Sequence, residues 1–169
     1  MRFLDSLVLD GVGLTSRLHE GSAALIPTDT LPALAACPKY AGQLWKMKRR
    51  SANKPLILMG ACPEDLFLWA SPYALDDAWS LARRHWPGAL TIVLPAFGSV
   101  LDALNPGAIT LGMRVPGCRV TRQLLAKSGP LATTSANLAG DSPALTAEEA
   151  ANCFPGLPLL GPLPWPIPS

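Results

Sequence analysis

The sequence has little that would hold a metal ion or a disulfide framework. It contains four cysteines, widely spaced and without a Cys-x-x-Cys pair, and only two histidines. We therefore expect reduced cysteines packed inside the protein and no tightly bound metal. The first residues also lack the long uncharged run of a signal peptide or membrane span. This favours a cytoplasmic protein without a membrane segment.

Charged residues are scarce as well. They make up 15% of the chain against 49% hydrophobic residues, a composition that excludes a disordered protein. The 14 basic and 12 acidic residues leave a net charge of +2, so the whole molecule is not a polycation. Binding to a polyanion would therefore depend on local clustering of charge. The length of 169 residues suffices for one domain with a substantial core.

One stretch has no acidic residue at all, from position 30 to position 63. Six of the 14 lysines and arginines lie inside it, between Lys39 and Lys54. Such a cluster suits a triphosphate or an RNA backbone, because guanidinium groups match phosphate oxygens. A solvated basic surface is the alternative. The chain has no G-x-x-x-x-G-K-[ST] motif, so a P-loop is excluded.

Short apolar runs bounded by glycine or proline alternate with stretches of helical spacing, which predicts an α/β or mixed α+β sheet protein. The predicted strands are 22–27, 55–60, 89–95, 108–116 and 130–135, and the predicted helices are 10–21, 39–50, 71–88, 119–129 and 146–154. We expect residues 1–154 to form the domain. Residues 155–169 contain six prolines and are expected to run as an extended, mostly irregular segment across the surface.

Three candidate sites follow predicted strands or lie inside one. Thr28 and Thr30 flank an aspartate at a strand end, where open α/β sheets bind ligands. Residues 133–137, Thr-Thr-Ser-Ala-Asn, offer small hydroxyl and amide groups at another strand end. The alternative for both is a turn whose side chains bond their own backbone. Arg114, inside an apolar strand, needs an anion or an acid as partner unless it reaches solvent from an edge strand.

The order of the motifs is more specific than any one of them. "PTDT", "K-x-R-x-x-x-K-P-L", "WPGALTIVL", "RVP" and "TSAN" follow one another between about residues 26 and 150. This order closely resembles the YrdC-like family of threonylcarbamoyl-AMP synthases, in a short, single-domain form. The resemblance implies a twisted, largely open mixed sheet with flanking helices and a basic concave cavity. It also implies condensation of L-threonine, bicarbonate and ATP into threonylcarbamoyl-AMP and pyrophosphate.

The resemblance further implies the partners and the site residues. Threonylcarbamoyl-AMP would be used to modify adenosine 37 in tRNA, and the proteins of the transferase complex would carry out that transfer. Mg²⁺ would be bound to ATP when ATP enters the site. The family's Lys-Arg-Ser-Asn set, assigned to catalysis, falls on Lys48, Arg50, Ser135 and Asn137. The residues implied for ATP are Lys48, Arg50, Lys54, Thr110 and Asn137. Those implied for threonine are Thr28, Thr30, Arg114 and Ser135.

The chain departs from the family pattern in several places, among them Ala139 where serine is common and Ser51 where proline is usual. The family's Val-Tyr-Gly-Leu after "TDT" is replaced within residues 31–36, so that Pro32 and Ala33 stand where tyrosine and glycine are usual. Met59 stands where some members carry histidine. Many relatives continue into a further strand that lines the substrate site, so we expect a more open threonine site here. These departures favour the alternative of a noncatalytic protein that binds double-stranded RNA, tRNA or a nucleotide.

Overall fold

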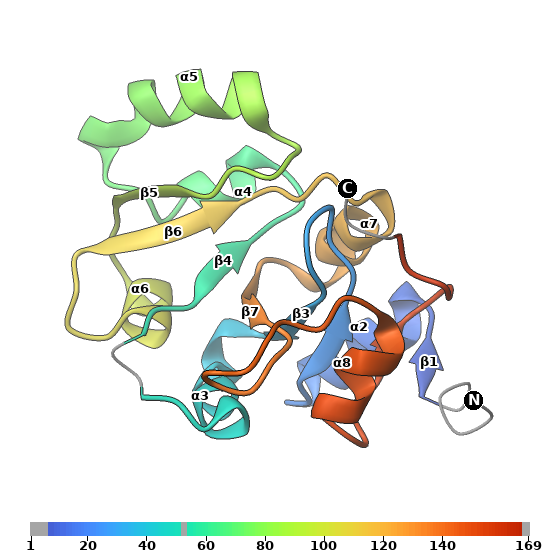
Figure 1. Cartoon of the computed structure of the whole chain (residues 1–169). Coiled ribbons are helices and arrows are strands. Elements are labelled where there is room, and N and C mark those ends of the chain that lie inside the picture. The colour runs from blue at the N-terminus through green and yellow to red at the C-terminus, as the bar shows by residue number, and fades with distance from the viewer. Residues whose placement is uncertain (1–6, 52–53, 167–169) are drawn as a thin grey trace.

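The structure is a computed structural model in which residues 7–51 and 54–166 are described. Its centre is one twisted, open sheet of eight strands, in the order β1-β8-β2-β3-β7-β4-β6-β5 (Figure 1). The strands are β1 (Val8–Leu9), β2 (Ala24–Ile26), β3 (Ala33–Ala36), β4 (Ile57–Met59), β5 (Ile92–Pro95), β6 (Thr110–Arg114), β7 (Leu131–Ser135) and β8 (Leu159–Leu160). The sheet is mixed: β8 runs parallel to both β1 and β2, and β4 runs parallel to β6, while the other neighbouring pairs are antiparallel.

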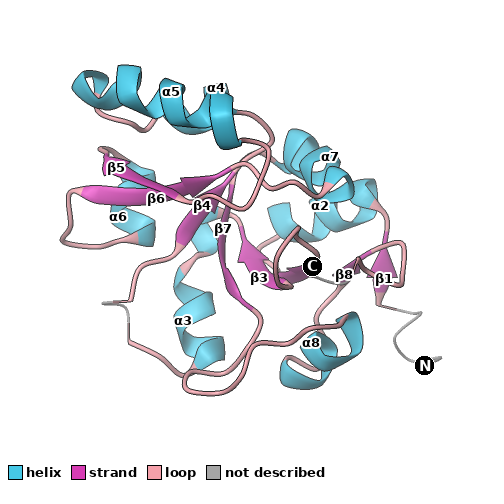
Figure 2. Cartoon of the chain, turned by 45° about the horizontal axis from the view of Figure 1, so that its top comes forward, coloured by secondary structure: helices cyan, strands magenta, loops and turns pink. Residues whose placement is uncertain are grey.

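Helices cover both faces of this sheet. The α-helices are α2 (Gly11–His19), α3 (Gly42–Lys48), α4 (Pro63–Phe67), α5 (Leu75–His85), α6 (Ser99–Leu104), α7 (Arg119–Ser128) and α8 (Ala147–Cys153). In Figure 2, α2 and α7 lie together on one side of the sheet, and α3 and α8 lie on the other. Two short 3-10 turns, η1 (Pro38–Tyr40) and η2 (Pro72–Ala74), precede α3 and α5. None of the helices in the described part of the chain is long and apolar enough to span a membrane.

Alternation along the strands divides the buried side chains between two cores. In β2, Ala24 and Ile26 pack with α2 and α7, whereas Leu25 joins the larger core beneath α3 and α8. Successive strand residues point to opposite faces, so a strand buried on both faces reads as a continuous apolar run. This is why the run at 22–27 predicts a strand without showing alternation. The four cysteines are free thiols, and Cys37 and Cys118 are buried.

The five predicted strands all occur, but three further strands carry no clear signal in the sequence. The strand β3 lies inside the stretch that departs from the family pattern, and all four of its residues are buried. Three of the four are alanine, which favours helices in isolation, so packing between β2 and β7 overrides the intrinsic preference. The predicted helix 71–88 begins as the turn η2, and the side chain of Ser71 does not cap it.

The proline-rich segment is only partly a surface segment. It supplies β8, which lies between β1 and β2 in the sheet. Leu159, Leu160 and Trp165 are buried, and the Trp165 indole N–H donates to the Leu160 carbonyl at 2.7 Å. Prolines on either side of β8 confine it to two residues, because a proline has no N–H to add to the ladder. The segment between 155 and 166 therefore contributes to the same core as the helices.

Candidate functional site

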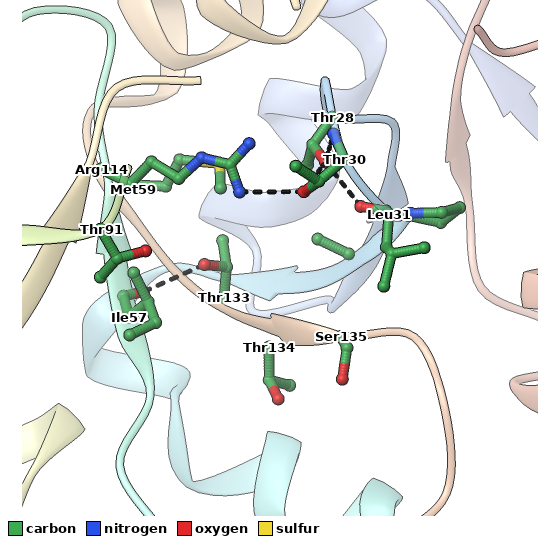
Figure 3. A pocket seen from close by; sticks show the side chains of 12 residues that line it. Thr28, Thr30, Leu31, Ile57, Met59, Thr91, Arg114, Thr133, Thr134 and Ser135 are labelled. Carbon is green, nitrogen blue, oxygen red and sulfur yellow. Dashed lines mark hydrogen bonds between the residues drawn. The ribbon is translucent and has the colours of Figure 1, made fainter. Parts of the chain in front are cut away.

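A small pocket opens where the loop after β2 faces strands β4, β6 and β7 (Figure 3). Its volume is about 160 Å³. The lining residues are Thr28, Thr30, Leu31, Pro32, Ala33, Ile57, Met59, Thr91, Arg114, Thr133, Thr134 and Ser135. Arg114 is the one charged residue among them. A pocket with apolar walls, several hydroxyls and one cation suits a small molecule that carries a carboxylate.

Strand alternation explains part of the lining, although at the end of β7 the consecutive residues Thr133, Thr134 and Ser135 all line the pocket. Ile57 and Met59 line it, whereas Leu58 between them points into the larger core. Likewise Thr133 lines the pocket, and its neighbour Ala132 belongs to the core on the opposite face. The Thr133 hydroxyl donates to the Ile57 carbonyl at 3.1 Å, which fixes its rotamer. The pocket therefore lies on the same face of the sheet as α2 and α7.

The turn that carries Thr28 and Thr30 is bonded internally. The Thr28 hydroxyl donates to the Leu31 carbonyl at 2.6 Å and accepts from the Thr30 amide at 3.0 Å. This is the self-bonded turn that the sequence left open as an alternative. It nevertheless directs the Thr30 hydroxyl at the pocket, where that oxygen accepts from Arg114 Nη1 at 3.1 Å. The same two threonines thus form the turn and line the pocket.

Arg114 is held on three sides. Its Nε donates to the Gly88 carbonyl at 3.0 Å, Nη1 to Thr30, and Nη2 to the Asp29 carboxylate, with which it forms an ion pair. Only 9% of the residue is exposed. Of the two readings of this arginine, the acid partner is the one observed, and solvent exposure is wrong. The acid is Asp29, the middle residue of the threonine turn.

Lys48 reaches the other rim of the pocket from α3. Its Nζ donates at 2.8 Å to both the Thr134 hydroxyl and the Ser135 carbonyl, and lies 3.3 Å from both Ser135 Oγ and Asn137 Oδ1. The Ser135 hydroxyl in turn donates to Asn137 Oδ1 at 2.6 Å. Three of the four residues that the motif marks as catalytic are therefore in contact. Burial, reinforced by the charge of Arg50, lowers the pKa of Lys48 to about 8.

The local sequence explains why a lysine is buried here. Leu44 and Lys48 are four residues apart in α3, so they share the face that packs on the sheet. The helix ends at Arg49, whose φ of 55° is left-handed, and this turns the chain away from the sheet. The Lys48 carbonyl accepts from the Ala139 amide at 2.9 Å, which ties the loop after β7 to the helix end. The ammonium is thereby fixed beside Ser135 and Asn137.

Arg50 and Lys54 lie outside this network. Arg50 is half-buried, and its Nη2 donates to the carbonyls of Lys54 and Pro55 at 3.3 and 3.2 Å. Its buried Nε has no hydrogen-bond partner within residues 7–51 and 54–166. Burial also lowers the pKa of Arg50. Lys54 is exposed. A buried guanidinium donor that lacks an acceptor is available to an anion.

Thr110 is not part of the pocket. It begins β6, four residues before Arg114, and its carbonyl accepts from the Asn105 side-chain amide at 2.8 Å. At about 3.3 Å per strand residue, its Cα is roughly 13 Å from that of Arg114. Of the residues that the resemblance marks for ATP, the pocket lining includes none. The cavity is thus less basic than expected, and the cations of α3 lie at its rim or beyond.

Sequence reasoning missed three residues of this region. Asp29 and Thr134 lie inside motifs that the sequence analysis describes. The sequence did not predict that Asp29 contacts Arg114 or that Thr134 contacts Lys48. Thr91 lines the pocket from the residue before β5, and no pattern in the sequence distinguishes it from an ordinary strand threonine. In the part of the chain that the structure describes, no group of three or more acidic, histidine or cysteine side chains could hold a metal ion.

An open mixed sheet, with a pocket beside the Thr-Asp-Thr turn that follows β2 and a buried lysine nearby, places the protein in the class of mixed α/β sheet proteins. Residues 16–157 match the model of the Sua5/yciO/yrdC family, whose description is "Telomere recombination". This match covers most of the chain. The chain therefore belongs to the Sua5/yciO/yrdC family, as the motif order indicates.

Relatives with established names agree with this assignment. The threonylcarbamoyl-AMP synthase of Bos taurus is 31% identical over 149 residues, which are 86% of this chain and 53% of the bovine protein. That of Idiomarina loihiensis is 35% identical over 137 residues, covering 76% of this chain and 72% of the relative. The Sua5 protein of Pyrococcus abyssi complexed with L-threonine superimposes with a TM-score of 0.83 at 29% identity, over 92% of this chain and 46% of that one. The chain spans about half the length of the bovine and archaeal relatives it matches.

Proposed function

We propose that this chain is an L-threonylcarbamoyladenylate synthase. It would condense L-threonine, bicarbonate and ATP into threonylcarbamoyl-AMP, pyrophosphate and water. The observation that carries the proposal is the contact of Lys48, Ser135 and Asn137 at the rim of a pocket that offers one fixed arginine. The names of the relatives and the L-threonine complex of the Pyrococcus Sua5 support the choice of substrate.

The chemistry fits these residue types. The amine of threonine attacks bicarbonate or CO₂ to give an N-carboxylate. An oxygen of this new group attacks the α-phosphorus of ATP, and pyrophosphate leaves with the electrons of the bond that breaks. No protein nucleophile is required. The protein has to gather several anions against their mutual repulsion, and cations in a partly dry site do this effectively.

The residues of the site have different proposed roles: some bind threonine, some stabilise the reacting groups, and some bind ATP. Arg114, with the turn of Thr28 and Thr30, binds the α-carboxylate of threonine. Lys48 stabilises the negative charge of the N-carboxylate and the α-phosphate between them, with Ser135 and Asn137 orienting it. The phosphate oxygens of ATP, which carries Mg²⁺, would bind Arg50 and Lys54, the two cations that follow α3. Thr110, the first residue of β6, would also contact the nucleotide.

The product defines the proposed partners. Threonylcarbamoyl-AMP is a reactive mixed anhydride, so it would pass to the proteins that transfer its acyl group to adenosine 37 of tRNA, in the cytoplasm. A second candidate function is binding of tRNA or double-stranded RNA without turnover. The observation in its favour is that Lys46, Arg49 and Lys54 are exposed and no ion pair occupies them within the described residues. Such cations suit a phosphate backbone.

Pyrophosphate release decides between the two. The chain is incubated with Mg²⁺-ATP, L-threonine and bicarbonate, and each component is omitted in turn. We expect release that requires all three, together with a product of the mass of threonylcarbamoyl-AMP. Release that persists without threonine would indicate a different nucleotide reaction. Absence of release, with tRNA bound in a salt-dependent manner, would contradict the synthase and favour the RNA-binding candidate.

A further inference from the structure

Asp29 contributes to the site without lining its pocket. It lies between the two pocket threonines in sequence but is not among the lining residues, and its carboxylate contacts the loop after β6. Oδ1 of this carboxylate accepts from both Arg114 Nη2 and the backbone N–H of Gly117, the latter at 2.8 Å. Among the described residues, the pocket residue that this carboxylate contacts is Arg114.

Three chain segments meet at this ion pair. Asp29 belongs to the loop between β2 and β3, and Gly117 to the loop between β6 and α7. Gly88, in the segment between α5 and β5, accepts from Arg114 Nε and donates its own N–H to the Val115 carbonyl at 2.9 Å. The guanidinium is thus clamped between separate loops at the mouth of the pocket. A guanidinium held at Nε and at both terminal nitrogens cannot rotate freely.

The contacts also decide which donors remain for a ligand. A guanidinium has five N–H donors in a fixed plane. Within the described residues, three of them have acceptors: one on Nε, one on Nη1 and one on Nη2. One donor on each terminal nitrogen is left, and a carboxylate takes two such donors in parallel. Asp29 therefore takes one donor of Nη2, and each terminal nitrogen keeps one donor for a ligand.

Gly117 makes this arrangement sterically tight. A Cβ at position 117 would lie 2.9 Å from Asp29 Oδ2 and 3.0 Å from its Cγ. The first distance is shorter than real Cβ contacts and the second is tighter than most of them, so a side chain there would push the carboxylate. Since the backbone angle φ of Gly117 is not left-handed, an alanine would strain the contact with Asp29 and not the backbone. The position thus gives a way to move the carboxylate without deleting it.

We propose that Asp29 is a positioning residue, which with Gly117 fixes the Arg114 guanidinium so that its remaining donors receive the α-carboxylate of the substrate amino acid. The inference rests on the proposed function for the identity of that substrate. It does not rest on turnover, because binding of the amino acid alone reports on it. A purely structural role for Asp29, as the counter-charge of a buried arginine, would stabilise the fold without affecting the affinity for threonine.

The test compares Asp29→Asn and Gly117→Ala with the parent chain. Calorimetry measures binding of L-threonine and, separately, of Mg²⁺-ATP, and thermal unfolding reports on stability. We expect the dissociation constant for threonine to rise about 10- to 100-fold in Asp29→Asn and severalfold in Gly117→Ala. The constant for ATP should stay within about twofold. Gly42→Ala is the matched control, because a Cβ there has no atom within 4 Å.

A second readout follows Arg114 itself. In the parent, the ¹⁵N signal of Arg114 Nε should be sharp, protected and unique, as expected of a clamped guanidinium. Asp29→Asn should broaden it or shift it toward solvent-exposed arginines. If both variants bind threonine like the parent, or keep that signal unchanged, the positioning role is wrong. Threonine binding that depends on Asp29, without pyrophosphate release by the parent, would instead contradict the synthase and leave the positioning role supported.

Discussion

The two arginines of the site differ in almost every physical respect. Arg114 is buried, its guanidinium is bonded on three sides, and a carboxylate compensates its charge. Arg50 is half-buried, contacts two backbone carbonyls, and has a buried Nε that finds no partner in the described part of the chain. Arg114 therefore has its charge and three of its donors satisfied within the protein, whereas among the described residues Arg50 keeps a buried donor without a partner and has no ion pair.

The difference matches the ligands proposed for each end. A single carboxylate of a small amino acid is recognised by geometry, so an arginine fixed in advance loses little entropy on binding. A triphosphate carries several charges and is recognised by net positive charge, which an internal carboxylate would cancel. Lys48 lies between the two in character, because it is buried like Arg114 but its hydrogen-bond acceptors among the described residues are neutral oxygens. Four predictions examine this comparison.

Loss of the Arg50 fork should have the largest effect. In the proposed complex Arg50 makes a charge-assisted contact to phosphate. Arg50→Ala should therefore weaken binding of the transition state by about 2–4 kcal/mol, which is measured as a slower rate of pyrophosphate release. Arg50→Lys keeps the charge but loses the planar fork, and should be almost as impaired. Arg49→Ala is the neighbouring control, and thermal melts check folding. If all three variants kept full activity, the basic residues between Lys39 and Lys54 would be solvated surface charges without a role in the reaction.

Substrate choice should depend on the pocket walls. Ile57, Met59 and Ala33 offer apolar contacts to the methyl group of threonine, which serine lacks. One methyl group is worth about 1–3 kcal/mol in such a pocket. We therefore expect kcat/KM for threonine to exceed that for serine by about 5- to 150-fold. Equal efficiency with the two amino acids would show that the Pro32–Ala33 departure has opened the pocket.

The protonation of Lys48 should appear in the stability of the fold. Its pKa of about 8 in the folded protein is below the ordinary value of 10.5, so above pH 8 the unfolded chain binds more protons than the folded one. The free energy of unfolding should therefore rise with pH between about 8 and 10.5. Its four oxygen contacts favour the ammonium and offset part of the desolvation, so the rise should be about 1–2 kcal/mol.

The control for this prediction is Lys48→Met, which has no group to titrate there. Urea unfolding at intervals from pH 7 to pH 10 gives both stability curves. We expect the free energy of unfolding of the parent to rise relative to that of Lys48→Met as the pH increases across this interval. Parallel curves would mean that the folded protein keeps Lys48 charged throughout, as a fully compensated ammonium would be.

The smallest effect is expected at Arg49. Its left-handed φ of 55° is a conformation that glycine adopts without strain, so Arg49→Gly should stabilise the chain by about 0.5 kcal/mol. Arg49→Ala retains the strain and should not. Pyrophosphate release should stay within twofold in both, while any salt-dependent affinity for tRNA should fall because an exposed cation is lost. A larger loss of stability in the glycine variant than in the alanine variant would contradict this.

Much of the sheet could be predicted because its strands are short apolar runs between glycines and prolines. The run at 55–60 and the run at 130–135 both become strands that flank the pocket. The strand β3 could not, because a run rich in alanine has no β preference of its own and takes its conformation from two neighbours distant in sequence. The same holds for β8, whose two residues pair with strands some 135 and 150 positions earlier.

For the site, motif order predicted which residues gather but not how they interact. The contact of Lys48 with Ser135 and Asn137 confirms that the separated motifs meet. That Asp29 would pair with Arg114 is a contact across 85 residues, and no local pattern encodes it. Whether Arg50, Lys54 and Thr110 hold a nucleotide stays a prediction, since Thr110 lies at the far end of β6 from the pocket.

The position of β8 has a consequence for how the chain reaches this state. Strand β2, whose end carries the threonine turn, has β8 as one of its two neighbours. On the ribosome that neighbour emerges some 135 residues after β2, since Leu25 pairs with Leu159. Until then one edge of β2 is unpaired, and nascent chains with such open edges are prone to associate with one another. The end of the sheet that carries the threonine turn is thus expected to mature late, in a step that waits until residues 159–160 have emerged.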